Sequence, residues 1–288
     1  KNCSNACYAV KYFLQILFRR HTRSYSWYES SVLLNFLGNL LGIKNNHRIK
    51  IGKSYNQYKV KEIVKPGIST KDLDDYAHKL IKKMGDQPAF LNYRPAGVDF
   101  AYPASLCVSV NNEVVHGIPN AKKILQEGDI VSLDLGLKHK NLFTDMALTL
   151  PVGKISPASA KLIKITEEAL EVGINAAQGG FKVGDISHSI ESFVRPHRYG
   201  IVEVLSGHGV GRAIHEDPYV PNFGKAGVGP KLVPGMVIAI EPMLNNGTKN
   251  LILDGDGYTF RTADGKKSAH FEHTILITEG EPEILTKI

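Results

Sequence analysis

The stretches Leu-Gln-Glu-Gly-Asp-Ile-Val-Ser-Leu-Asp at residues 125–134 and Leu-Val-Pro-Gly-Met-Val-Ile-Ala-Ile-Glu at residues 232–241 follow one pattern. Each has a glycine three residues after its first leucine and then an apolar run that ends in an acid, Asp134 or Glu241. A second acid opens a further apolar run in each half, Asp145 before Met-Ala-Leu-Thr-Leu and Glu272 before His-Thr-Ile-Leu-Ile. This repeat predicts two similar αβ halves about an approximate twofold, each delivering two carboxylates to a shared centre. Any two αβ units share such a strand pattern, but four acids within apolar strands favour the repeat.

Around the repeat, short apolar runs alternate with amphipathic stretches from about residue 64 onward, which predicts an α+β fold. Helices are expected over residues 70–84, 157–178 and 185–197, capped by Ser69 or Thr70, by Ser156 and by Asp185. The expected strands cover residues 106–110, 129–135, 145–150, 202–205, 236–241 and 270–278.

Four carboxylates in apolar strands indicate a metal centre. An unpaired acid in such a setting must be neutralised by a proton, a basic side chain or a cation, and no Lys or Arg adjoins these acids in their strands. Four acids brought together would also repel one another unless divalent ions compensated their charge. Their combined charge of about −4 matches two divalent cations.

A nitrogen ligand is available in the segment Gly-His-Gly-Val-Gly-Arg-Ala-Ile-His at residues 207–215. Glycines on both sides of His208 allow the close backbone approach that a crowded site needs. His215 follows seven residues later, and His116 ends the run Glu-Val-Val. The same glycines do not complete a dinucleotide-binding G-x-G-x-x-G motif, because its third glycine position falls on Arg212.

These motifs together resemble the type I methionine aminopeptidases, a family of metallopeptidases with the pita-bread fold. The motifs are Val-Val-His116-Gly-Ile-Pro, Ser-Leu-Asp134-Leu-Gly, Phe-Thr-Asp145, Gly-His208-Gly-Val-Gly-Arg-Ala-Ile-His215-Glu-Asp-Pro, Ala-Ile-Glu241-Pro-Met and His-Phe-Glu272-His-Thr. The resemblance runs from about residue 64 to residue 285. It implies a pita-bread fold whose two pseudo-twofold-related halves surround a dinuclear metal centre. It also implies removal of the N-terminal methionine from nascent proteins when the second residue is small.

The resemblance also implies a role for each site residue. Metal ligands would be Asp134, Asp145, His208, Glu241 and Glu272, binding two divalent ions that could be Co, Mn, Fe or Zn. Glu241 is the candidate general base, and His116 and His215 would contact the substrate and stabilise the developing oxyanion. The methionine pocket would be lined by Tyr93, Tyr102, Cys107, Ile214 and Tyr258, although core packing explains the aromatic residues equally well. His270, on the same strand face as Glu272, either adds a polar group near the metals or lies at the rim.

The chain of 288 residues has a net charge of +7, and this charge is concentrated at its start. Residues 1–60 hold ten Lys and Arg and one Glu, a net charge of +9, which leaves the rest of the chain at −2. We therefore expect a basic, poorly patterned extension over residues 1–63 and a catalytic domain over residues 64–288. The extension is a candidate for contact with ribosomal RNA, and equally for a poorly ordered segment.

Three cysteines, Cys3, Cys7 and Cys107, are too few for a disulfide framework, and no apolar run reaches the roughly twenty residues of a membrane span. We therefore expect a cytoplasmic protein without membrane contact. We also expect a monomer, and the resemblance implies that it acts on nascent polypeptide N-termini. Two alternatives are an Xaa-Pro dipeptidase and a non-catalytic pita-bread binding module. The first usually carries a large additional N-terminal domain, and the second loses ligands that this chain retains.

Overall fold

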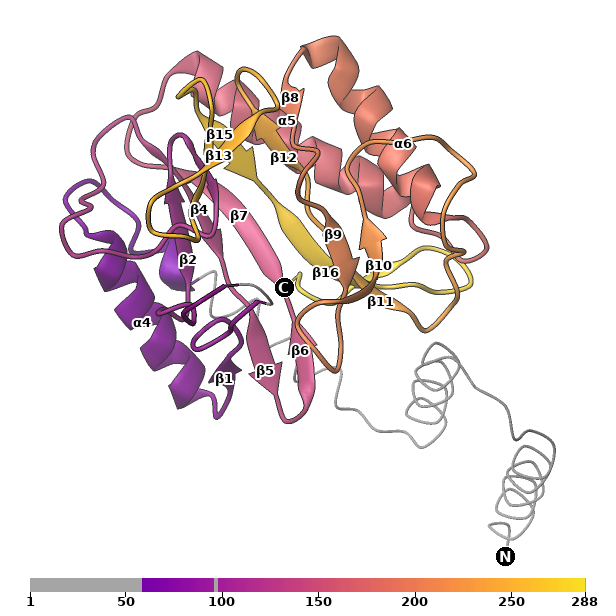
Figure 1. Ribbon diagram of the computed structural model, residues 1–288, viewed down its shortest axis with the longest axis horizontal. Coiled ribbons are helices and arrows are strands. Elements are labelled where there is room, and N and C mark those ends of the chain that lie inside the picture. The colour runs from indigo at the N-terminus through magenta and orange to yellow at the C-terminus, as the bar shows by residue number, and fades with distance from the viewer. Residues whose placement is uncertain (1–58, 96–97, 288) are drawn as a thin grey trace, which may run out of the picture. The chain divides into compact units, whose positions relative to one another are not determined.

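The structure is a computed structural model that describes residues 59–95 and 98–287 (Figure 1). These residues belong to one compact unit, Ile43–Ile288. Most of the basic extension, with Cys3 and Cys7, lies outside the described residues. The expected boundary at residue 64 stays a prediction, but Val60 is already fully buried in the same core as Leu73 and Leu133.

An eight-stranded antiparallel sheet forms the centre of the fold, with the strand order β10-β9-β11-β16-β7-β4-β2 and β17 paired to β16. Its strands are β2 (Cys107–Val110), β4 (Ile130–Asp134), β7 (Met146–Pro151), β9 (Gly207–Gly209), β10 (Glu216–Val220), β11 (Val237–Ile240), β16 (Glu272–Leu276) and β17 (Glu283–Ile284). The two predicted repeats are β4 with β7 and β11 with β16. They meet where β7 pairs with β16, and β2 and β9 flank them on either side. This arrangement places the predicted twofold at the middle of the sheet.

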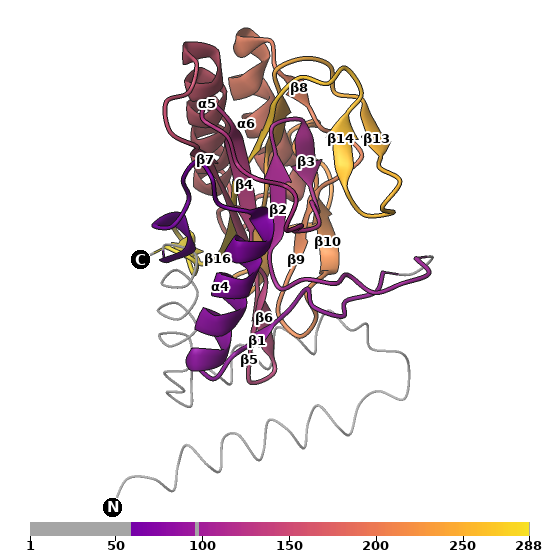
Figure 2. The same ribbon diagram turned by 90° about the vertical axis from the view of Figure 1, so that its left-hand side faces the viewer.

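Three smaller sheets extend the centre. They contain β1 (Gln87–Pro88), β5 (Leu137–His139) and β6 (Leu142–Thr144); β8 (Gly200–Ile201), β12 (Met243–Asn245) and β15 (Ser268–His270); and β3 (Glu113–Val115), β13 (Leu251–Leu253) and β14 (Phe260–Thr262). The hairpin of β13 and β14 lies on the opposite side of the sheet from the helices (Figure 2).

The helices are α4 (Thr70–Lys83), α5 (Pro157–Asn175) and α6 (Val183–Val194), followed by a short 3-10 helix, η1 (Arg195–His197). Helix α4 buries Leu73, Ala77 and Ile81 against the β2–β4 half of the sheet, whereas α5 and α6 pack against each other and cover the β11–β16 half. Because each helix buries its apolar stripe on the sheet, the opposite sheet face is left for the polar side chains at the strand ends.

The predicted helix starts at Ser69 and Ser156 are confirmed, since each serine side chain accepts a hydrogen bond from the first helical turn. The predicted cap at Asp185 is wrong. Helix α6 begins after Lys182, and Asp185 lies inside the first turn, where its carboxylate accepts the Lys182 N–H at 2.8 Å. An acid at that third position stabilises the helix start as the second half of a capping box does.

Two predicted strands are also corrected. Residues 202–205 form a loop between β8 and β9, in which Val202 is buried and Leu205 packs beside it, whereas Val204 is 72% exposed. The single strand predicted over residues 270–278 is divided at Phe271 into β15 and β16, which belong to different sheets. This break places His270 and Glu272 at the junction of two sheets.

Candidate metal centre

The central strands bring the predicted metal ligands to one face of the sheet. Ala147 of β7 is paired with Asp134 of β4 on one side and with Glu272 of β16 on the other. Directly paired residues share a face, so both carboxylates flank the small Ala147 side chain. Asp145 lies two residues before Ala147, just ahead of β7. The repeat thus brings three acids from three neighbouring strands to the same place.

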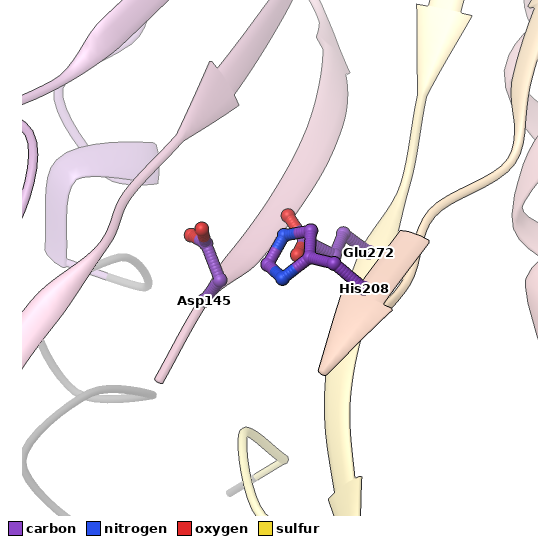
Figure 3. Close-up of side chains that lie close together, drawn as sticks. All are labelled: Asp145, His208 and Glu272. Atoms are coloured by element: carbon purple, nitrogen blue, oxygen red, sulfur yellow. The ribbon is translucent and has the colours of Figure 1, made fainter. Parts of the chain in front are cut away.

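Asp145, His208 and Glu272 form the most compact group, and all three are buried. One ligand atom from each lies within 4.8 Å of the others, and in Figure 3 the Glu272 carboxylate overlaps the His208 ring while the Asp145 carboxylate lies to one side of both. Asp134 and Glu241 are outside this group but line the same cavity. The cavity therefore contains all five residues that the sequence assigned to metal binding.

His208 is held in a narrow slot between two strands. A Cβ atom at Gly207 would lie 2.3 Å from the Ala239 carbonyl oxygen, and one at Gly209 would lie 2.1 Å from the Asp217 carbonyl oxygen. Only glycine fits at either position, which is the physical reason for the Gly-His-Gly sequence. The Nδ1 atom of His208 lies 2.9 Å from the Gly209 carbonyl oxygen. Because a carbonyl only accepts, Nδ1 carries the proton and the lone pair of Nε2 is available to a metal.

Glu241 follows β11 and lies between two imidazole rings. Its Oε1 is 3.5 Å from Nε2 of His208, and its Oε2 is 3.5 Å from Nε2 of His270. Burial and the neighbouring Asp145 charge raise the pKa of the Glu241 carboxyl well above its usual value. A carboxylate oxygen and an imidazole lone pair at this spacing are close enough to bind one cation with ligand distances near 2.1 Å. The donor set, one imidazole among four carboxylates, therefore fits divalent metal binding.

A cavity of about 610 Å³ adjoins the ligands, and its other walls are mostly aromatic and apolar, with Ser206, Glu216 and Asp217 as further polar lining residues. Four of the five predicted pocket residues line it: Tyr93, Tyr102, Cys107 and Tyr258. Ile214 does not line the cavity but packs behind it in one buried cluster with Tyr102, Cys107 and Tyr258. Phe90, Pro95, Leu205 and Tyr219 also line the cavity. No sequence pattern marked these four, because they come from loops and strand ends outside the motifs.

The two predicted substrate histidines stand at different parts of this cavity. His116 has a left-handed backbone with φ of 58°, and burial together with the nearby His215 and His270 lowers its pKa to about 4. His215 lies at the mouth, where its Nδ1 is 2.8 Å from the Tyr93 hydroxyl and its ring centroid is 4.5 Å from that of His208. Desolvation lowers the pKa of His215, while Glu241 opposes that shift. Both rings are therefore expected to be neutral near pH 7.

His270 lies behind Glu241 rather than at a rim. Its side chain is 1% exposed, and burial lowers its pKa to about 4. Glu241 has a second neighbour, Asn222, whose side-chain N–H donates to the Glu241 carbonyl oxygen at 3.1 Å. The sequence left open whether His270 lies near the metal ligands or at the rim of the site, and the structure places it near the ligands.

Comparison with known proteins identifies the family of the chain. Residues 53–279 match metallopeptidase family M24. The methionine aminopeptidase of Aquifex aeolicus is 48% identical over 80% of this chain and 90% of its own length, and methionine aminopeptidase 1 of Bacillus subtilis is 46% identical over the same shares. The chain belongs to the methionine aminopeptidases of metallopeptidase family M24.

Solved structures agree with this assignment to the family. The methionine aminopeptidase from Thermotoga maritima has a TM-score of 0.79 and 41% identity, over 83% of this chain and 95% of that protein. The prolidase from Pyrococcus furiosus, at 23% identity and a TM-score of 0.67, shares the fold, but this chain covers only 64% of it. The pita-bread fold and the metal-dependent aminopeptidase predicted from the sequence are thereby confirmed, and the Xaa-Pro dipeptidase alternative is not favoured.

Membership of an M24 metallopeptidase family also implies the use of divalent metal. Among the helices of the described residues, none is both long enough and apolar enough to cross a membrane.

Proposed function

We propose that this chain removes the N-terminal methionine from newly made proteins whose second residue is small, with two divalent ions held by Asp134, Asp145, His208, Glu241 and Glu272. The observation that carries the proposal is the position of this ligand set at the end of an apolar cavity. A cavity of about 610 Å³ suits one amino-acid side chain with the adjoining peptide bond, rather than a folded partner.

Divalent cations bound by these residues would acidify a water molecule and polarise the scissile carbonyl, and Co, Mn, Fe and Zn all accept such ligands. Asp145 and Glu272, whose ligand atoms lie close together, would each bind to both ions. Asp134 would complete the ligand set of one ion, and His208 with Glu241 that of the other.

Glu241 is the residue that we assign as general base. In the metal-free chain, burial and the Asp145 charge raise the pKa of its carboxyl. Beside bound metal, its carboxylate would accept the proton that the attacking water releases. His116 and His215 are assigned as hydrogen-bond donors to the substrate peptide and to the oxyanion that develops during attack. When the Tyr93 hydroxyl donates to Nδ1 of His215, Nε2 of that ring carries the proton and can donate to the substrate.

The methionine side chain is assigned to the aromatic wall of the cavity. Cys107 is buried there, and its surroundings raise the pKa of the thiol well above its usual value, so that it stays protonated and weakly polar beside a thioether. Tyr102 donates its hydroxyl proton to the Gly117 carbonyl oxygen at 2.9 Å, and Tyr258 donates to the Phe100 carbonyl oxygen at 2.5 Å. With both hydroxyls engaged, the rings present apolar faces to the pocket.

The direct test is cleavage of Met-Ala-Ser by the purified full chain after addition of Co²⁺ or Mn²⁺, with Ala-Pro-Ser as the control peptide. Release of methionine from the first peptide alone is the expected result. Cleavage of the proline peptide instead would point to an Xaa-Pro peptidase, and bound metal without cleavage of either peptide would point to a binding module.

The same proposal includes a cytoplasmic, monomeric enzyme whose basic extension contacts ribosomal RNA. The net charge of +9 in residues 1–60 supports this contact, since phosphate binding is electrostatic. Full-length chain should co-sediment with ribosomes at low salt and dissociate as salt rises, while a chain lacking residues 1–42 should not co-sediment. Equal sedimentation of both forms would remove the extension from the proposal.

A further inference from the structure

His270 is a buried polar side chain that the proposed mechanism does not use. It is 1% exposed, and neither Nδ1 nor Nε2 of its ring has a hydrogen-bond partner among the described residues. A buried imidazole without hydrogen bonds is destabilising, because its polar atoms have lost water and gained nothing in return. The ring does not line the cavity, so the substrate is not its missing partner. Oε2 of Glu241 lies 3.5 Å from Nε2 of the ring.

The twofold of the sheet gives His270 a counterpart in the first half. Strands β7 and β16 pair at Ala147 and Glu272. Continued by two residues toward the start of β7, the same register sets Asp145 opposite Thr274. Continued by two residues the other way, it sets Thr149 opposite His270. A twofold through the Ala147–Glu272 pair therefore exchanges Asp145 with His270, and not with Glu272 as the sequence repeat predicted. His270 occupies in the second half the place that the metal-facing Asp145 occupies in the first.

Hydrogen bonds support this equivalence, because a threonine hydroxyl holds both backbones in the same way. The Asp145 N–H donates to Thr274 Oγ1 at 2.8 Å, and that hydroxyl donates to the Asp145 carbonyl oxygen at 2.7 Å. The His270 N–H donates to Thr149 Oγ1 at 2.8 Å, and that hydroxyl donates to the His270 carbonyl oxygen at 2.9 Å. The His270 backbone is thus fixed as tightly as that of a proposed ligand, which favours a defined position for its ring.

We propose that His270 is a positioning residue, which donates from Nε2–H to Oε2 of Glu241 and so keeps Oε1 turned toward His208 and the metals. The inference rests on the proposed function, because it assigns a partner to the residue proposed there as ligand and base. A carboxylate that accepts on one oxygen cannot rotate freely, so its other oxygen stays directed at the centre. The 3.5 Å separation shortens to hydrogen-bond length with a small movement of the carboxylate.

Two amides distinguish the two ring nitrogens. A glutamine places its amide nitrogen near the position of Nε2, whereas an asparagine places its nitrogen near the position of Nδ1. His270→Gln should therefore retain the hydrogen bond to Glu241, while His270→Asn and His270→Leu should lose it. His78→Asn is the matched control, because His78 bonds to Ser105 through Nδ1, which the asparagine nitrogen replaces, and does not line the cavity.

The deciding measurement is calorimetric titration of the metal-free full chain and its variants with Co²⁺ alone. The Asn and Leu variants should bind about 10- to 100-fold more weakly than the wild type, with the Gln variant within about threefold of it. In the Met-Ala-Ser assay the Asn variant should lose kcat with little change in KM, because His270 does not touch the substrate. Circular dichroism and thermal melting identify variants that fail to fold. If His270→Leu fails to fold, the Co²⁺ affinities of His270→Gln and His270→Asn are compared instead.

The proposal is overturned if His270→Gln and His270→Asn change Co²⁺ affinity equally, whether both weaken it or both preserve it. It is also overturned if all variants bind Co²⁺ as the wild type does, or if the wild type binds no Co²⁺. Because calorimetry needs no peptide cleavage, a chain that binds metal normally but leaves Met-Ala-Ser intact would refute the proposed function alone.

Discussion

The two halves of the central sheet share a backbone arrangement and differ in the chemistry that they supply. The first half, β4 and β7, presents carboxylates alone, Asp134 and Asp145. The second half, β11 and β16 with β9, presents Glu241 and Glu272 together with His208. The shared strand ends therefore fix where ligands stand, while each half has its own ligand types. Because the two halves repeat the backbone but carry different side chains, the two sides of the proposed metal centre are not equivalent.

A second difference concerns the strands that flank the repeats. Strand β2 is the outer strand of its half, beside β4 alone, whereas β9 lies between β10 and β11. The crowding of β9 explains why glycines stand on both sides of His208, since the carbonyls of Ala239 and Asp217 exclude a Cβ atom there. Strand β2 contributes Cys107 to the substrate cavity. The second half therefore supplies the imidazole ligand, whereas both halves line the pocket.

The largest expected effect comes from removing one carboxylate charge from each half. Glu241→Gln should lower kcat on the order of 10³-fold, because it removes a general base as well as a ligand. Asp134→Asn removes only a ligand and should lose less, since higher metal concentration compensates for weaker binding. Steady-state assays on Met-Ala-Ser over a series of Co²⁺ concentrations separate the two. Equal losses at saturating metal would mean that the halves contribute alike and that Glu241 is not the base.

The sequence predicted the proposed ligands better than their surroundings. Asp134 and Glu241 end apolar runs, and the register of the sheet brings both to one cavity, as the repeat required. The relation of His270 to Glu241 depends instead on a break at Phe271 that moves the chain from one sheet to another. An apolar pattern cannot show such a break, because both segments are buried and extended. Residues in loops, such as Phe90 and Leu205, carried no motif either.

The next effect is on stability and depends on pH. Burial lowers the pKa of His116, His270 and His273 to about 4 from an ordinary value of 6.5. As pH falls from 6.5 toward 4, these histidines therefore become protonated in the unfolded chain but stay neutral in the folded chain, so the folded state loses stability. The free energy of unfolding should fall by about 1 kcal/mol per pH unit for each histidine. The raised pKa of Glu241 acts in the opposite direction, because the folded state takes up that proton more readily, and offsets part of the loss.

Urea unfolding of the metal-free chain at pH 7 and at pH 5.5 measures this dependence. Two of the three histidines belong to the second half, and His273→Gln should flatten the pH dependence by removing one of them. The same free energy of unfolding at both pH values would show that burial does not lower the pKa of these histidines.

The smallest effect tests a contact between the halves. Tyr93, from the segment before β2, places its hydroxyl 2.8 Å from Nδ1 of His215, which precedes β10. Tyr93→Phe keeps the ring and removes this hydrogen bond, so His215 should lose its fixed tautomer. A hydrogen bond of about 1 kcal/mol corresponds to a fall of about fivefold in kcat/KM. Co²⁺ affinity should not change, because neither residue is a proposed ligand.

Tyr219→Phe is the control for this contact, since Tyr219 also lines the cavity but is 72% exposed at its mouth. That variant should retain the activity of the wild type. If both variants lost activity equally, any hydroxyl at the mouth would matter and the tautomer would not. If Tyr93→Phe weakened Co²⁺ binding, the substrate histidine and the metal centre would be coupled through the 4.5 Å contact of His215 with His208, and the two halves would act as one site.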